Sequence, residues 1–140
     1  MNTKTAFDLI FRNARTRAST IPVDIGVAGG RIAAIEPRLA CEAAEIDVGG
    51  KLTLPGFVDT HIHLDKACLL GRCGHDHGSV TEAIAAVASM KRDFTVEDVY
   101  ARGARVIERA IVHGTTRMRT HVEIDPRIGL RGFEAVKALR

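Results

Sequence analysis

The sequence predicts an α/β protein in two parts, and three observations support this fold class. Residues 1–55 hold only short apolar runs separated by glycine pairs and turn residues, the pattern of a small β-domain. From residue 56 onward the pattern changes to strand, helix, strand, helix, which implies parallel strands joined by crossover helices. Pro55-Gly56 separates the two patterns, so we place a domain boundary there, between domains 1–55 and 56–140.

The N-terminal part is expected to consist of short strands and tight turns. A β-rich run opens it at residues 6–14, and residues 23–27 then alternate with the period of a half-buried strand. Gly29-Gly30, followed by a second apolar run at 31–35, predicts a hairpin because glycine adopts the positive φ angles of such turns. A last short strand is expected at 44–48.

The C-terminal part is expected to alternate strands and helices. Strands are predicted at 57–64 and 117–124 from their apolar and alternating residues. Ser79 and Thr95 each stand three residues before an acidic residue, the arrangement of a helix N-cap. A last helix is expected after Pro126 and runs to the C-terminus with no stop signal. Two parallel strands cannot cover themselves, so this sheet needs further strands.

Composition excludes several classes of protein. Hydrophobic residues make up 46% and charged residues 26%, as in a soluble globular protein. Aromatic residues are scarce at 4% and the arginines behind the net charge of +3 are scattered, which argues against nucleic-acid binding. No membrane span or signal peptide is evident, so a cytoplasmic location is expected, with Cys41, Cys68 and Cys73 as reduced thiols.

The segment Asp59-Thr60-His61-Ile62-His63-Leu64-Asp65 contains the clearest chemical signal. Residues two apart in a strand point to the same side, so His61 and His63 project together. Two such imidazoles can share one divalent ion, and imidazole ligands suit zinc or iron rather than magnesium or calcium. Taken alone, the pair fits equally well two histidines on a polar strand face.

The residues around this pair resemble a known family. The segment from Leu54 to Leu64, Leu-Pro-Gly-Phe-Val-Asp-Thr-His-Ile-His-Leu, is similar to the signature that opens the catalytic barrel of the amidohydrolase superfamily. Asp65-Lys66-Ala67 and the segment from Gly114 to Glu123 are similar to cytosine deaminases and to related hydrolases that remove amines from triazine or pyrimidine rings. With the strands and glycine pairs before Leu54, the resemblance covers nearly the whole chain.

The resemblance implies a (β/α)₈ TIM barrel, of which this chain holds the first two βα units, preceded by N-terminal strands of a small β-sandwich. His61 and His63 would be metal ligands, and a metal-activated water would deaminate, or release an amine from, a small heterocyclic ring. Relatives commonly form homo-oligomers. The remaining ligands and acid/base groups of this superfamily come from strands four, five, six and eight, which lie outside residues 1–140.

Further polar residues near the histidine pair are candidates for the same site. Asp65 and Lys66 follow the ligands, whereas His121 and Glu123 share a strand face that would point into the barrel. We predict that these four residues contact substrate or orient the metal ligands; a local salt link or a buried structural pair is the alternative. His75-Asp76-His77 is interpreted as ordinary loop polarity.

Two other functions stay open on the sequence. One is a cyclic-amide hydrolase resembling dihydropyrimidinase or hydantoinase, which shares the Asp-x-His-x-His strand. The other is an inactive truncated fragment, because the chain ends inside a predicted helix and offers two of the about three protein ligands that a catalytic zinc needs. The zinc deaminases that edit nucleic-acid bases are excluded, because their His-x-Glu and Pro-Cys-x-x-Cys motifs are absent.

Overall fold

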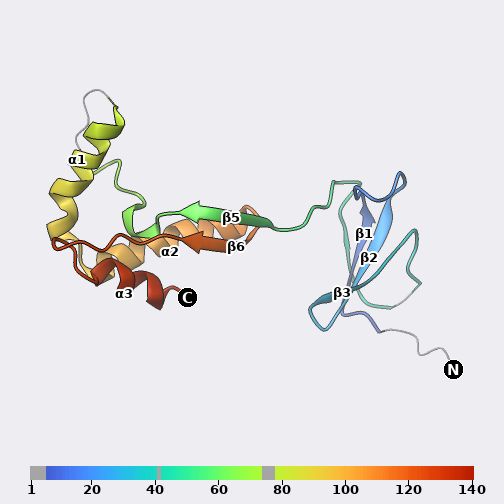
Figure 1. Cartoon of the computed structure of the whole chain (residues 1–140). Helices are drawn as coiled ribbons and strands as arrows, with labels where there is room; N and C mark the ends of the chain where they lie inside the picture. Colours follow the sequence, from blue (N-terminus) through green and yellow to red (C-terminus); the bar gives the residue numbers. More distant parts are fainter. Residues whose placement is uncertain (1–5, 41, 74–77) are drawn as a thin grey trace. The chain divides into compact units, whose positions relative to one another are not determined.

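The computed structural model describes residues 6–40, 42–73 and 78–140 (Figure 1). The chain divides into two units, Met1–Pro55 and Gly56–Arg140. The division falls between Pro55 and Gly56, where the sequence pattern changes from strands and turns to alternating strands and helices. The predicted α/β class is confirmed, because the first unit is built on strands and the second combines strands with helices.

The first unit is a four-stranded sheet in the order β3-β2-β1-β4. Its strands are β1 (Leu9–Ala14), β2 (Val23–Ala28), β3 (Arg31–Glu36) and β4 (Ala44–Asp47). Neighbouring strands are antiparallel except for β1 and β4, which are parallel. The predicted hairpin is confirmed as β2 and β3, and Gly29 and Gly30 turn the chain at φ angles of 56° and 71°.

A cluster of ion pairs centred on the buried Arg12 spans neighbouring strands of this sheet. The guanidinium of Arg12 pairs with Asp24 and Glu45 and donates to the carbonyl of Leu39 at 2.7 Å. Arg12 and Asp24 are both buried, and Asp24 also accepts from the backbone N–H of Leu39 at 3.0 Å. Because a buried charge is tolerated only when it is paired, these contacts tie the segment around Leu39 to the two central strands.

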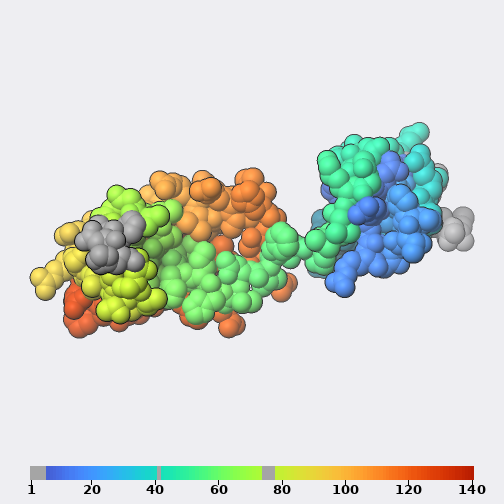
Figure 2. All heavy atoms as spheres, turned by 90° about the horizontal axis from the view of Figure 1, so that it is seen from above, coloured from blue at the N-terminus to red at the C-terminus, as the bar shows by residue number. Residues whose placement is uncertain are grey.

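The second unit holds a two-stranded parallel sheet of β5 (Phe57–Ile62) and β6 (Thr115–Thr120). Its helices are α1 (Val80–Met90), α2 (Val96–Val112) and α3 (Arg131–Ala138), with short 3₁₀ turns η1 (Leu64–Lys66) and η2 (Lys91–Asp93). Figure 2 shows the orange residues of α2 and β6 beside the green residues of β5. Within the described ranges, no helix is long and apolar enough to cross a membrane.

Both predicted helix starts are confirmed. The Ser79 hydroxyl accepts from the backbone N–H of Glu82 at 3.2 Å, and the Thr95 hydroxyl accepts from that of Asp98 at 3.1 Å. The longer helix α2 packs against α3, and their apolar side chains close a core with the residues around them. The buried members of this core are Leu69, Phe94, Val99, Ile128 and Ala135.

Three elements of the second unit have boundaries that differ from the predicted ones. Strand β5 ends at Ile62 rather than at residue 64, because Leu64 begins a 3₁₀ turn and its N–H donates to the hydroxyl of Thr120 at 3.2 Å. Strand β6 spans 115–120 rather than 117–124, since its ladder with β5 extends no further. The last helix starts at Arg131, because Asp125 accepts the backbone N–H groups that follow it and holds the chain in turns.

Candidate metal centre

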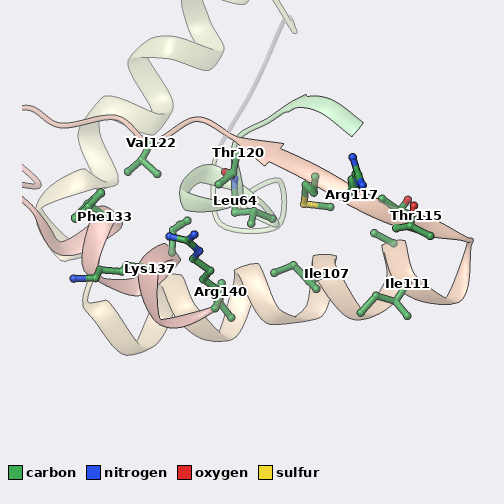
Figure 3. Close-up of a pocket in the computed structure, with 15 residues that line it drawn as sticks. Leu64, Ile107, Ile111, Thr115, Arg117, Thr120, Val122, Phe133, Lys137 and Arg140 are labelled. Carbon is green, nitrogen blue, oxygen red and sulfur yellow. The ribbon is translucent and has the colours of Figure 1, made fainter. Parts of the chain in front are cut away.

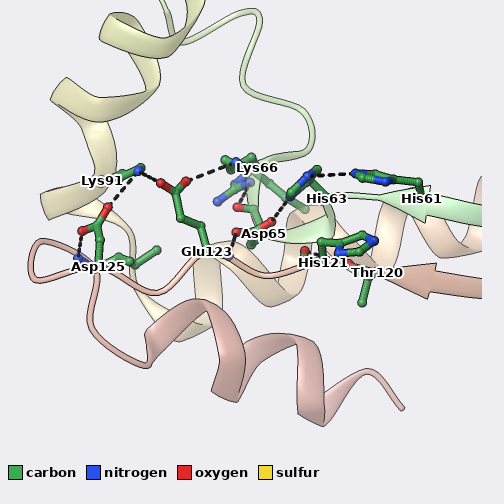
Figure 4. Close-up of polar contacts among 11 residues, drawn as sticks. His61, His63, Asp65, Lys66, Lys91, Thr120, His121, Glu123 and Asp125 are labelled. Carbon is green, nitrogen blue, oxygen red and sulfur yellow. Dashed lines mark hydrogen bonds and ion pairs between the residues drawn. The ribbon is translucent and has the colours of Figure 1, made fainter.

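Two imidazoles converge where β5 ends (Figure 4). The Nε2 atoms of His61 and His63 are 3.4 Å apart. Two imidazole nitrogens bound to one tetrahedral zinc, each at about 2.0–2.1 Å, stand about 3.3 Å from each other. The separation therefore fits two ligands of a single ion, as the spacing of the two residues predicts. The backbone N–H of His61 is held by the Asp59 carboxylate at 3.1 Å, which fixes the end of the strand.

The second nitrogen of His63 also fits a metal ligand. Its Nδ1 is buried and lies 3.7 Å from Oδ1 of Asp65, and neither atom has a hydrogen-bond partner in the part of the chain that the structure describes. Asp65 is 1% exposed. Metal-bound histidines usually donate their other ring N–H to a carboxylate, which fixes the tautomer and the ring orientation. Asp65 stands in the position of that carboxylate.

A third imidazole lies beside the pair. The backbone N–H of His121 donates to the carbonyl of Ile62 at 2.8 Å, which places its ring against His61 with 4.1 Å between ring centroids. Desolvation of the ring lowers the pKa of His121, and the neighbouring charges of His61 and His63 lower it further. Among the described residues, however, no three histidine, cysteine or acidic groups are arranged to hold a metal ion. His121 therefore lies at the site without completing a ligand set.

A row of charges borders the site. Lys66 contacts Glu123 at 3.1 Å, and Lys91 contacts Glu123 at 2.5 Å and Asp125 at 2.8 Å. The bond from Lys91 is the main reason that the pKa of Glu123 lies below its usual value, and the same lysine lowers the pKa of Asp125 to about 2. Burial lowers the pKa of Lys91, but its bonds to the two carboxylates outweigh burial and raise it. Glu123, Asp125 and Lys91 therefore stay ionised near neutral pH.

A buried arginine holds the turn that follows His61 and His63. Arg102 of α2 is 3% exposed and donates through Nη1 to the carbonyls of Asp65 at 3.1 Å and Ala67 at 2.7 Å. Its Nε donates to Asp98 at 3.0 Å, and its guanidinium carbon lies 4.8 Å from the ring centroid of Phe94. The backbone of η1 is thereby fixed to α2.

The structure brings all six predicted site residues together. His61, His63, Asp65 and Lys66 follow one another at the end of β5, while His121 and Glu123 follow the end of β6. The prediction that His75-Asp76-His77 shows only ordinary loop polarity concerns positions outside the described residues. Sequence reasoning missed Lys91, Arg102 and Asp125, which lie on helices or in a turn and reach the site only through tertiary contacts.

A groove lies along the other side of β6, between α2 and α3 (Figure 3). Its volume is about 640 Å³, and apolar side chains such as Leu64, Ile107, Met118 and Phe133 line much of it. In the described sheet β6 pairs only with β5, so one edge of β6 carries no partner strand. This groove is therefore largely apolar, with Arg117, Lys137 and Arg140 among its charged lining residues, and it borders an open strand edge.

Comparison with known proteins assigns the family. The model of the Amidohydrolase family matches residues 52–140, which include both histidines. This chain belongs to the amidohydrolase family. The resemblance predicted from the Leu54–Leu64 segment is therefore confirmed.

Amidohydrolases that act on small ring compounds are among its relatives. N-isopropylammelide isopropyl amidohydrolase of Pseudomonas sp. (strain ADP) is 37% identical over 93% of this chain and 34% of its own length. The structure of 5-methylcytosine deaminase from Klebsiella pneumoniae with 5-fluorocytosine superposes with a TM-score of 0.80 and 30% identity, over 93% of this chain and 32% of that one. A dihydroorotase of Anoxybacillus flavithermus is 40% identical over 61% of this chain and 20% of its own length. The chain thus spans about a third of the length of the first two relatives.

Proposed function

We propose that this protein is a metal-dependent hydrolase that deaminates, or releases an amine from, a pyrimidine- or triazine-like ring. The observation that carries the proposal is the pair of imidazole nitrogens 3.4 Å apart at the end of β5. In the proposed reaction the oxygen of water forms a bond to the ring carbon, the C–N bond breaks, and ammonia or an amine leaves with a proton. A divalent ion held there would supply hydroxide near neutral pH by lowering the pKa of its water.

The residues of the site take different parts in this proposal. His61 and His63 hold the ion, for which zinc or iron is the chemistry that imidazoles favour. His121 is exposed beside both ligands and is the candidate for substrate contact. Lys66 and Glu123 pair with each other at 3.1 Å, which supports a role in orienting the site.

We extend the proposal to the fold and the setting of the protein. The parallel strands β5 and β6 are the first two of a (β/α)₈ TIM barrel, and the sheet of residues 1–55 is part of a small β-sandwich. The open edge of β6 and its apolar groove support this assignment, because a third barrel strand would pair there. A homo-oligomer in the cytoplasm, acting on a small heterocyclic molecule, completes the proposal.

The second candidate is a cyclic-amide hydrolase, and the similarity to a dihydroorotase favours it. The two candidates differ in the bond that is broken. A ring deaminase breaks a C–N bond outside the ring and releases ammonia or an amine, whereas a cyclic-amide hydrolase opens the ring and releases nothing. Product analysis therefore separates them.

The test is turnover by the purified full-length protein loaded with zinc or with iron. Ammonia release from cytosine and 5-methylcytosine, isopropylamine release from N-isopropylammelide and ring hydrolysis of dihydroorotate are measured in parallel. Amine release that is lost in His61→Ala and His63→Ala, and retained in the exposed-histidine control His113→Ala, supports the deaminase. Ring opening alone supports the second candidate. No bound metal and no turnover would refute both candidates.

A further inference from the structure

The ring of His63 faces a carboxylate that has little freedom to move. The backbone carbonyl of Asp65 accepts from Arg102 at 3.1 Å, and its Oδ2 accepts from the backbone N–H of Glu123 at 2.9 Å. The remaining oxygen, Oδ1, points toward Nδ1 of His63 at 3.7 Å (Figure 4). With 1% of Asp65 exposed, no solvent-facing rotamer competes with this arrangement.

The position of the Glu123 amide depends in turn on Lys91. The side chain of Glu123 lies between the ammonium groups of Lys91 and Lys66, at 2.5 Å and 3.1 Å. Lys91 also binds Asp125 at 2.8 Å, so it contacts the residues on both sides of the exposed Ile124. Lys91 is 7% exposed, and its ion pairs are screened less by solvent than surface pairs are. The segment 123–125 is therefore fixed to the end of α1.

We propose that Asp65 and Lys91 are positioning residues for the metal ligand His63. Asp65 acts directly: when His63 turns to take up the ion and the 3.7 Å between its Nδ1 and Oδ1 of Asp65 shortens, Oδ1 accepts the Nδ1 proton and Nε2 is presented to the ion. Lys91 acts through Glu123, whose backbone amide holds the Asp65 carboxylate in place. Neither residue needs to touch substrate. The inference rests on the proposed function, because it assumes that His63 binds a metal.

The first test needs no variant. In the zinc-loaded wild-type protein, a histidine side-chain ¹H–¹⁵N correlation spectrum should show His63 bound through Nε2, with a slowly exchanging proton on Nδ1. A His63 bound through Nδ1, or an Nδ1 proton that exchanges as fast as that of an exposed histidine, overturns the inference.

The second test is the zinc affinity of the purified full-length protein and its variants, by competition with a chromophoric chelator. Outer partners of metal ligands typically contribute 10–100-fold to affinity, so Asp65→Asn should lose about 10–100-fold. Lys91→Met acts one step further away and should lose about tenfold, the lower end of that range, while Lys91→Arg keeps the cation and should recover most of the loss. Lys51→Met removes an exposed lysine of the first unit and is the matched control.

The outcomes separate the inference from the function on which it rests. If the wild-type protein binds no zinc, the proposed metal centre is refuted and the inference falls with it. If the wild-type protein binds zinc and Asp65→Asn binds it equally well, only the inference is refuted. The role of Lys91 is refuted if Lys91→Met matches Lys51→Met. Thermal midpoints of the metal-free variants show whether each one folds. If Asp65→Asn does not fold, the histidine spectrum of the zinc-loaded wild-type protein decides whether Asp65 positions His63.

Discussion

Replacing Arg102 with methionine tests whether α2 holds the turn that follows His61 and His63. Methionine keeps most of the apolar stem but removes every hydrogen bond of the guanidinium. The carbonyls of Asp65 and Ala67 then lose their donor in a buried place, and Asp98 loses one of its two arginine partners. The stacking of the guanidinium on Phe94 is lost as well.

The magnitude follows from these contacts. An orphaned buried acceptor costs about 1–3 kcal/mol, so the two carbonyls together contribute about 2–6 kcal/mol. The ion pair with the part-exposed Asp98 adds at most about 1 kcal/mol, and the cation–π contact about 1 kcal/mol. Since methionine packs part of the vacated space, we expect a loss of about 3–5 kcal/mol in the free energy of unfolding, a large share of the about 5–15 kcal/mol that stabilises a typical domain.

The protein carries a built-in probe for this measurement. It has one tyrosine and no tryptophan, and Tyr100 lies on α2 two residues before Arg102. Urea titration followed by tyrosine fluorescence therefore reports on the second unit. Arg105→Met changes an exposed arginine of the same helix and should stay within about 0.5 kcal/mol of the wild type. If Arg102→Met also stays within about 1 kcal/mol, the buried carbonyls are not held as described.

Two further predictions concern the rest of the chain. Arg12→Met leaves Asp24 buried without its cation and should lower the thermal midpoint of the first unit by about 10 °C or more, measured by circular dichroism. Burial raises the pKa of Asp24, but the hydrogen bonds from Leu39 and Arg12 outweigh burial and lower it overall. The stability that these bonds contribute is present above the unfolded pKa of about 3.9 and is lost as the pH falls through the lower pKa of the folded state. That acid-induced loss should be smaller in Arg12→Met, and an unchanged acid transition would contradict this explanation. Gly56→Ala places a methyl group 2.1 Å from Cγ2 of Thr116, so it should destabilise the second unit by about 1–3 kcal/mol in the urea titration followed by tyrosine fluorescence. If adding Thr116→Ser, which removes Cγ2, does not relieve part of this loss, the clash is refuted.

The elements and the histidine pair were predictable because their signals are local. Alternation, glycine pairs and N-caps operate within a few residues, which is why the hairpin and the starts of α1 and α2 were predicted correctly. The spacing of His61 and His63 is likewise a local property of a strand. The ends of β5 and β6 were mispredicted because tertiary contacts decide them, such as the bond from Leu64 to the Thr120 hydroxyl.

The residues that support the site have no such signal. Lys91 stands where α1 gives way to η2, and nothing in its neighbourhood marks it as buried among carboxylates. Arg102 lies within an amphipathic helix, where an arginine is expected on the solvated face. Its burial depends on η1, whose 3₁₀ turn was not predicted. Partners that are distant in sequence become visible only once the chain is folded.

The parallel pairing of β5 and β6 has a consequence for any strand that joins them. In a parallel sheet all strands end at the same edge, so both present strands deliver their following residues to the histidines. If a further parallel strand paired with the free side of β6, the residues at its C-terminal end would lie next to His121. The direction of β5 and β6 therefore determines on which side of the sheet the residues that follow any further parallel strand would lie.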